Sequence, residues 1–295
     1  MLGIRNYERL DFMSELILDS FAKVNLSLDV INKRQDNYHN IATIFQEIDL
    51  RDGIYISNDK KYLDGGLNLT CDDKRIPTGE NNLVFKAWNL MKDMTDRQGV
   101  RIHIEKNIPL SAGLAGGSSN AAATVKGLNE IWNLNLSSDQ MINVCRKLGA
   151  DVSFFILGGT CLGEGIGDVL TPLKSLSGLK MLLVNAGFGV SSKYVYENLV
   201  IRDSEKLTYK LADAINNGKS DFYKYLNNDL EDVTLKNNPD IIKIKENMRR
   251  LGSKAELMCG SGPTVFGIFE DDYSLDNAFF FFKDKYDLSF KVNAR

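Results

Sequence analysis

Histidine and cysteine are scarce in this chain of 295 residues, which has two histidines and four cysteines. None of the cysteines belongs to a C-x-x-C pair, although zinc sites need closely spaced Cys and His ligands. The sequence therefore predicts no zinc site. We expect a reduced, cytoplasmic chain whose free thiols are buried. The four positions are Cys71, Cys145, Cys161 and Cys259.

Long apolar runs and an excess of positive charge are missing as well. No stretch approaches the roughly 18 apolar residues of a membrane-spanning helix, and the N-terminus is too charged for the core of a signal peptide. The chain has 36 basic and 39 acidic residues, a net charge of −3, and no basic stripe interleaved with aromatics. The sequence predicts neither a membrane nor a nucleic-acid partner and leaves the oligomeric state open.

Two common nucleotide-binding motifs are also absent. A Walker A loop needs glycine five residues before its Gly-Lys-Ser triplet, but Asp213 stands there relative to Gly218-Lys219-Ser220. We interpret that triplet as a surface turn. The glycines of residues 163–168 have the wrong spacing for a dinucleotide fingerprint.

The remaining pattern mixes strands and helices in a chain long enough for two domains with substantial cores. Alternating apolar residues predict strands, and apolar residues spaced three and four apart predict helices. The irregular order favours an α+β fold over a doubly wound sheet. The expected strands lie at 15–30, 54–58, 67–71, 101–105 and 180–185, with two more within 255–269, and helices follow Asn82, Ser119, residue 137 and Pro239.

The strongest local signal is a glycine- and serine-rich loop between a strand and a helix. Its glycines let the backbone approach a ligand and adopt positive φ, its serines supply hydroxyls, and the helix offers unpaired N–H groups. Together these predict a phosphate cradle; the alternative is a flexible connector. The loop, here called the glycine loop, consists of Pro109, Leu110, Ser111, Ala112, Gly113, Leu114, Ala115, Gly116, Gly117, Ser118 and Ser119.

Three polar residues in apolar surroundings are candidate site residues. Alternation places Lys23 and Asn25 on one face of the first strand, where they either line a site or belong to a half-exposed strand. Asp151 precedes the apolar run of residues 152–156. It is either a helix N-cap or a partly desolvated general base, and the residue alone does not decide.

Taken together, these segments resemble the GHMP small-molecule kinases. The glycine loop, followed by Asn120, is similar to the ATP-binding motif of that superfamily. Residues 259–263, Cys-Gly-Ser-Gly-Pro, are similar to its third motif, a glycine turn that closes over the phosphates.

A narrower resemblance is to the branch that phosphorylates a cytidine diphosphate-linked methylerythritol in the non-mevalonate route to isoprenoid precursors. The motifs that carry it appear in family order between residues 21 and 269. Three positions depart from the pattern: Asn37 replaces a glycine but tolerates positive φ, Ser153 replaces a proline, and Cys259 replaces a Ser or Thr. The motifs are residues 22–26, 36–39, 148–152, 164–168 and 228–231.

The resemblance implies two domains. Residues 14–172 would form a domain with a ribosomal-protein-S5-like fold, and residues 173–295 a ferredoxin-like domain, with ATP held between them by the glycine loop. The pattern does not need the residues before Met13, so residues 1–12 are expected to precede the true start or to form a short disordered tail.

The implied reaction moves the γ-phosphoryl group of ATP to the 2-hydroxyl of the substrate, with Mg²⁺ held by protein ligands that the sequence does not identify. Asp151 would accept the hydroxyl proton. Lys23, which the family places beside the aspartate, would hold Asp151 and the reacting groups in line and offset developing negative charge. The resemblance places the cytidine diphosphate substrate at Asn25, Tyr38, His39 and Tyr196, with Tyr194 as the alternative aromatic.

Other functions remain to be weighed against this one. A homoserine or mevalonate kinase of the same superfamily is disfavoured by residues 36–39, which suit a cytidine better. A non-catalytic binding protein is disfavoured because both Lys23 and Asp151 are present. An RNA-binding module on the S5-like fold is disfavoured by the acidic balance.

Overall fold

The computed structural model describes residues 15–58, 66–95, 99–203 and 205–295. The expectation for residues 1–12 lies outside these ranges. The chain forms two compact units, each assembled from separate stretches. Of the described residues, those within 15–22, 50–108 and 115–157 belong to unit 1, and those within 23–49, 109–114 and 158–295 belong to unit 2. The domain boundary between residues 172 and 173 stays a prediction.

Two long strands, β1 (Glu15–Lys33) and β2 (His39–Ser57), contribute to both units. In unit 1, β4 (Val100–Glu105) pairs antiparallel with the end of β2 and parallel with β3 (Leu67–Cys71). The expected alternation is confirmed in β4, where every second residue is buried.

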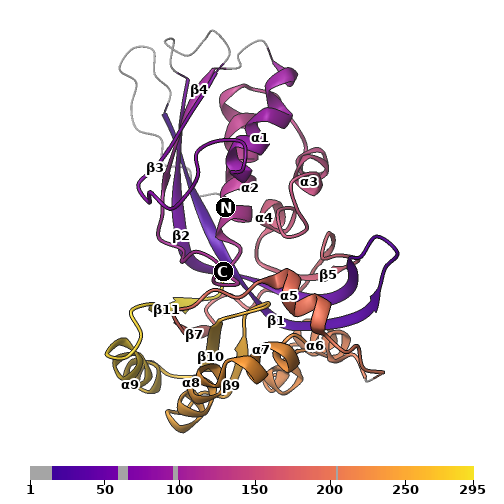
Figure 1. Ribbon diagram of the computed structural model, residues 1–295, viewed down its shortest axis with the longest axis vertical. Coiled ribbons are helices and arrows are strands. Elements are labelled where there is room, and N and C mark those ends of the chain that lie inside the picture. The colour runs from indigo at the N-terminus through magenta and orange to yellow at the C-terminus, as the bar shows by residue number, and fades with distance from the viewer. Residues whose placement is uncertain (1–14, 59–65, 96–98, 204) are drawn as a thin grey trace. The chain divides into compact units, whose positions relative to one another are not determined.

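The helices of unit 1 lie on one face of its strands (Figure 1). Asn82 caps the first of them, because its side chain accepts a hydrogen bond from the Val84 N–H, as expected. The next long helix begins at Gly116, earlier than the sequence predicted, so the last four residues of the glycine loop form its first turn. The helical segments are α1 (Leu83–Met91), η2 (Lys92–Met94), α2 (Gly116–Ile131), α3 (Ser138–Arg146) and α4 (Phe154–Leu157).

In unit 2, the short strand β8 (Asn227–Asn228) runs parallel to β1 at Ser27 and Leu28. The start of β2 pairs with β5 (Thr160–Glu164), which forms a hairpin with β6 (Val169–Pro172). The glycine-rich turn predicted at residues 163–168 makes this hairpin.

A second sheet in unit 2 has the strand order β11-β7-β10-β9, with all neighbours antiparallel. Helix α8 follows β7 and precedes β9, and α9 joins β10 to β11. This split β-α-β arrangement is the expected ferredoxin-like topology. The bounds are β7 (Lys180–Asn185), α8 (Pro239–Arg250), β9 (Ala255–Met258), β10 (Thr264–Phe269), α9 (Asp272–Lys283) and β11 (Ser289–Asn293).

Four further helical segments of unit 2 were not predicted from the sequence. The turn at residues 217–218 ends the helix α6 (Leu207–Asn216). The triplet Gly218-Lys219-Ser220 is therefore the exposed surface turn that we expected. Every helix in the described ranges is too short or too polar to cross a membrane. The segments are α5 (Ser192–Asn198), α6 (Leu207–Asn216), η3 (Phe222–Tyr225) and α7 (Glu231–Asn237).

Candidate functional site

The glycine loop turns through residues 111–115 rather than through its later glycines. Ser111, Gly113 and Ala115 have positive φ values of 51°, 77° and 55°. Gly116 and Gly117 instead open α2, where helical geometry requires negative φ. The expected positive φ is therefore confirmed at Gly113 and was misplaced at the other two glycines, because the sequence did not reveal how early the helix begins.

Gly113 is required by a close approach of two backbones within unit 2. A Cβ atom at this position would lie 2.3 Å from the carbonyl oxygen of Cys259, well inside van der Waals contact. One residue further, the Leu114 carbonyl accepts a hydrogen bond of 3.2 Å from the Lys23 N–H. The first half of the glycine loop is thus held against β1 and against the turn that contains Cys259.

The start of α2 belongs to unit 1 and presents its first residues unequally. Ser119 is buried, and its Oγ lies 2.7 Å from Ser20 Oγ. Gly117 is exposed, and a Cβ atom there would meet nothing nearer than a Leu83 methyl group at 4.0 Å. Ser118 is only partly buried. Gly117 and Ser118 are therefore the positions in this turn best placed to meet a ligand.

A buried ion pair fixes the entry to the glycine loop in unit 1. One oxygen of the Asp52 carboxylate accepts hydrogen bonds of 2.7 Å from the N–H groups of Asn107 and Ile108. The other lies 2.7 Å from Lys106 Nζ, and the two side chains are 0% and 5% exposed. The Lys106 ammonium also donates to the Ile108 carbonyl. Sequence reasoning missed this anchor, since nothing near Asp52 distinguishes it from other acids of the same segment.

Lys23 and Asn25 lie on the same face of β1, as expected, and Lys23 Nζ donates to Asn25 Oδ1 at 2.7 Å. Lys23 is 4% and Asn25 2% exposed, so the alternative of a half-exposed strand is wrong. The Asn25 amide donates to Thr43 Oγ1 at 2.8 Å, and the ammonium lies 5.3 Å from the centre of the Phe45 ring. Neither Thr43 nor Phe45 was predicted.

Asp151 lies in unit 1, in the turn between α3 and α4, and is partly buried. The residue directly before α4 is Ser153, since that helix begins at Phe154. The position of Asp151 therefore does not suit an N-cap. Its expected pairing with Lys23 would join the two units and stays a prediction.

The residues expected to hold a cytosine ring lie together in unit 2. The rings of His39 and Tyr196 are stacked, with their centres 5.2 Å apart, whereas Tyr194 is exposed. Tyr38 is 62% exposed and follows Asn37, whose φ of 67° confirms the expected tolerance. Burial, with a smaller effect of the Lys33 charge, lowers the pKa of His39, so its ring is neutral at pH 7 and offers one donor and one acceptor.

Three of the four free thiols are buried and unreactive. Burial raises the pKa of Cys145, Cys161 and Cys259 to about 12, so these thiols remain protonated and weakly nucleophilic. The expectation of buried thiols is confirmed for these three. Cys71 is only partly buried, because it ends the short strand β3.

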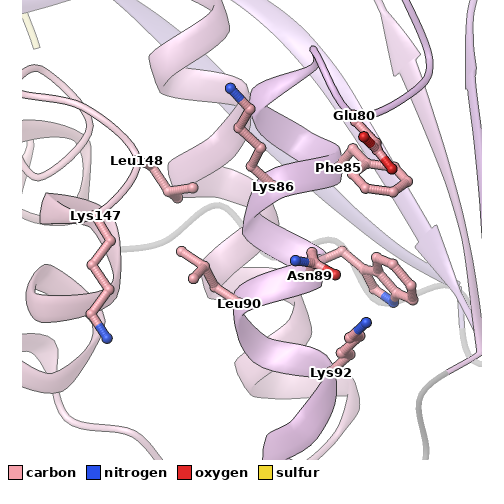
Figure 2. A pocket seen from close by; sticks show the side chains of 9 residues that line it. Glu80, Phe85, Lys86, Asn89, Leu90, Lys92, Lys147 and Leu148 are labelled. Carbon is pink, nitrogen blue, oxygen red and sulfur yellow. The ribbon is translucent and has the colours of Figure 1, made fainter.

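A separate pocket of about 630 Å³ lies over α1 in unit 1 (Figure 2). Its side chains come from α1, from Glu80 before it, from Lys92 of η2, and from Lys147 and Leu148 after α3. Lys86 and Lys92 add further positive charge to this lining. None of the residues predicted from the sequence as catalytic or binding residues lines this pocket.

Two protein families match this chain. Residues 82–159 match the GHMP kinases N terminal domain, and residues 211–288 match the GHMP kinases C terminal domain. The first match includes the glycine loop and Asp151, and the second includes the Cys259 turn.

Curated proteins are similar to it over most of their length and of its own. A 4-diphosphocytidyl-2-C-methyl-D-erythritol kinase of Clostridium perfringens is 42% identical over 276 residues, which cover 92% of this chain and 95% of the relative. The enzyme of the same name from Caldicellulosiruptor bescii is 44% identical over 261 residues, which cover 87% of this chain and 90% of the relative.

Solved structures show the same fold. A crystal structure of 4-(cytidine 5'-diphospho)-2C-methyl-D-erythritol kinase matches with a TM-score of 0.80 and 28% identity, covering 94% of this chain and 98% of that one. A homoserine kinase from Cytophaga hutchinsonii matches with a TM-score of 0.76 and 15% identity, covering 99% and 97%. The second likeness concerns the fold alone.

The anchor at Asp52 generates a stability prediction. Asp52→Asn replaces one acceptor oxygen by an N–H group, which then faces either the Lys106 ammonium or the two backbone N–H groups. Breaking one side of a buried ion pair costs about 3–5 kcal/mol, and we expect a loss of this size in the free energy of unfolding, measured by urea denaturation.

Asp49→Asn is the matched control. Asp49 accepts from the Asn293 N–H near the surface, so we expect a loss of no more than about 1 kcal/mol. The double variant Asp52→Asn/Lys106→Met should recover part of the loss. An Asp52→Asn protein as stable as the parent would show that the pair is not an anchor.

Proposed function

The chain belongs to the 4-diphosphocytidyl-2-C-methyl-D-erythritol kinase family of the GHMP kinases, and we propose that it transfers the γ-phosphoryl group of ATP to the 2-hydroxyl of 4-diphosphocytidyl-2-C-methyl-D-erythritol. The two-domain GHMP kinase architecture expected from the sequence is confirmed by the two family matches. The observation that carries the proposal is the glycine loop, which opens into a long helix with an exposed glycine at its start.

The start of α2 supports phosphate binding by physical means. A helix of 16 residues presents unpaired N–H groups and the positive end of its dipole at its N-terminus. Gly116 and Gly117 add no side chain in front of these groups. Residues 107 and 108 are fixed within unit 1, and residues 113 and 114 are fixed within unit 2, so binding of ATP does not have to order either part.

We propose that Mg²⁺ accompanies ATP near this turn. In the described ranges, no group of three or more His, Cys, Asp or Glu side chains is placed to hold a metal ion. Mg²⁺ does not require such a group, since it keeps several waters and binds through one or two carboxylates plus substrate phosphates. Ser118 is the hydroxyl that we propose as its protein ligand, because Ser119 is turned toward Ser20. When bound, Mg²⁺ offsets phosphate charge.

Phosphoryl transfer has a loose transition state, so positioning and charge stabilisation contribute most of the catalysis. We assign Asp151 the role of accepting the proton of the 2-hydroxyl. Lys23 offsets the negative charge that develops on the phosphoryl oxygens. Its hydrogen bond to Asn25 holds the ammonium in one position, which supports this role.

Cytidine is the proposed recognition element of the substrate. Stacking on aromatic rings does not distinguish one base from another, so selection requires hydrogen bonds to the base edge. Neutral His39 supplies a donor and an acceptor, and Tyr38 and Tyr196 supply rings. The contact between His39 and Tyr196 supports Tyr196 over Tyr194 as the aromatic of the second segment.

The rival functions are less well supported. The curated relatives that match most of the chain at 42–44% identity are cytidine-substrate kinases, whereas the homoserine kinase is 15% identical. A net charge of −3 disfavours an RNA-binding role. We propose a cytoplasmic location, which the buried, free thiols support.

A coupled assay of ATP consumption tests the choice between these functions. With the cytidine substrate, homoserine and mevalonate offered in turn, we expect turnover only with the cytidine substrate.

Gly117→Val tests the role of the glycine loop. The Cβ atom of the added side chain would lie no closer than 4.0 Å to any protein atom outside its own stretch of helix, and the side chain would stand where phosphates approach the backbone. We expect a folded protein whose ATP affinity is lower by at least about tenfold, or 1.4 kcal/mol, by isothermal titration.

Gly189→Val is the control, since a Cβ atom at that exposed glycine of unit 2 also meets nothing within 4 Å. Its ATP affinity should equal that of the parent. Gly116→Val is less informative, because its Cβ atom would crowd Ile108 at 3.0 Å. Unchanged ATP affinity in Gly117→Val would make the loop a mere connector.

Asp151→Asn tests the general base. The substitution keeps the shape and removes the proton acceptor, so turnover should fall by about 10²–10⁴-fold while ATP affinity stays the same. Single-turnover kinetics with the cytidine substrate measure the chemical step. Near-normal turnover would exclude Asp151 as the base.

Substitutions at Tyr38, His39 and Tyr196 test the proposed cytosine pocket. Tyr38→Ala and Tyr196→Ala should each weaken binding of the cytidine substrate by about 1–3 kcal/mol, and His39→Ala should reduce discrimination between cytidine and uridine forms. Tyr194→Ala is the control and should bind like the parent. If the three variants at Tyr38, His39 and Tyr196 bind the cytidine substrate and discriminate between bases like the parent, the base is recognised elsewhere.

A further inference from the structure

We propose that Asn228 is a positioning residue for the glycine loop, on which it acts through the turn at residues 259–262. This inference rests on the proposed kinase function and adds a residue to its machinery. Asn228 begins the motif of residues 228–231, which the sequence analysis singled out and to which the proposed reaction assigns no role.

The Asn228 side chain holds the turn on both sides of Cys259. Its amide nitrogen donates to the Met258 carbonyl at 2.8 Å and to the Gly260 carbonyl at 2.7 Å. Its amide oxygen accepts from the Leu230 N–H at 3.0 Å. Asn228 is 4% exposed, so both N–H groups are engaged away from water. No other natural side chain of this size offers two donors and an acceptor on one planar group.

The turn held in this way contacts two parts of the proposed site in unit 2. The Cys259 carbonyl oxygen packs so closely against Gly113 of the glycine loop that it would lie 2.3 Å from a Cβ atom there. A Cβ atom on Gly260 would lie 3.6 Å from Asn25 Oδ1 and 3.8 Å from the Gly113 carbonyl oxygen. A shift of the turn would therefore be transmitted directly to Gly113 and to the surroundings of Asn25.

The backbone of Asn228 is itself fixed by the strand that carries Lys23 and Asn25. In the parallel pairing of β8 with β1, Asn228 lies opposite Leu28. The Asp229 N–H donates to the Leu28 carbonyl at 2.9 Å. Asn228 thus connects β1 to the Cys259 turn. Because Lys23 lies on β1 and Gly113 packs against Cys259, Asn228 helps to fix the position of the first half of the glycine loop relative to Lys23.

Two later residues support the same turn from α7. Glu231 Oε1 accepts from the Met258 N–H at 2.9 Å, and the Thr234 hydroxyl donates to the Ser261 carbonyl at 3.1 Å. Each holds one end of the turn, whereas Asn228 bridges its centre. The cytosine pocket at His39 and Tyr196 makes none of these contacts, so the effect of Asn228 should fall on ATP rather than on the base.

Asn228→Asp is the sharpest test, because it keeps the shape and replaces both donors by a carboxylate oxygen facing two carbonyl oxygens. We expect kcat/KM for ATP to fall by about 10- to 100-fold, through a higher KM for ATP. The KM for the cytidine substrate should be unchanged.

The pH dependence separates positioning from general destabilisation. Burial and the two carbonyl dipoles raise the pKa of the introduced carboxyl group. Protonation restores one O–H donor, so the ratio of variant to parent kcat/KM for ATP should rise as the pH falls from about 8 to about 6. Asn228→Ala, which lacks both donor and charge, should lose ATP affinity with a ratio independent of pH. It also keeps the test available if Asn228→Asp does not fold.

Asn185→Asp is the matched control. Asn185 is also buried in unit 2, but its amide donates to the Thr264 hydroxyl at 2.9 Å, which can rotate to donate to a carboxylate. Its ATP kinetics should equal those of the parent. If the Asn228 variants unfold at lower temperature yet keep the parental KM for ATP and pH profile, the inference is overturned.

Failure of the proposed function has a different signature. In that case the parent itself does not phosphorylate the cytidine substrate, whatever the variants do. ATP affinity of parent and variants, measured by titration without the second substrate, then decides the inference separately: equal affinities overturn it, and weaker binding in both Asn228 variants supports it.

Discussion

The close approach of the Cys259 carbonyl oxygen to Gly113 is the constraint on which the rest of the candidate site depends. With 2.3 Å between that oxygen and the position of a Cβ atom, only glycine is accommodated. Two segments separated by about half of the chain thus meet backbone to backbone, and no side chain between them can absorb a change in either. Any residue that sets the Cys259 turn consequently also sets the first half of the glycine loop.

The glycine loop is held at its entry and at its middle by different kinds of interaction. At its entry, a buried carboxylate binds two backbone N–H groups and an ammonium group. Further on, close packing against Cys259 and a backbone hydrogen bond from Lys23 hold residues 113 and 114. Loops carry function best when a rigid scaffold positions them. Because the loop is ordered in advance, a ligand bound there does not lose affinity to the cost of ordering it.

Periodicity and turn chemistry allowed much of the fold and part of the candidate site to be predicted from the sequence. Alternation placed Lys23 and Asn25 on one face, and the tolerance of asparagine for positive φ anticipated the turn at Asn37. Prediction failed where a role depends on contacts distant in sequence. Asp52 and Asn228 resemble many other polar residues until the fold brings backbone N–H or carbonyl groups to them. The start of α2 was misplaced because glycines are poor helix formers, and tertiary packing overrides that preference.

The orientation of the Asn25 amide follows from its neighbours on either side. The Thr43 hydroxyl donates its proton to the Ser27 carbonyl at 2.6 Å, so toward Asn25 it acts only as an acceptor. The Lys23 ammonium acts only as a donor. Asn25 must therefore turn its nitrogen to Thr43 and its oxygen to Lys23, as the distances of 2.8 and 2.7 Å indicate. An amide in this place positions the ammonium without neutralising its charge, which a carboxylate would do. A directional chain that starts at a backbone carbonyl of β1 thus holds the ammonium of Lys23, the residue whose backbone N–H binds the Leu114 carbonyl of the glycine loop.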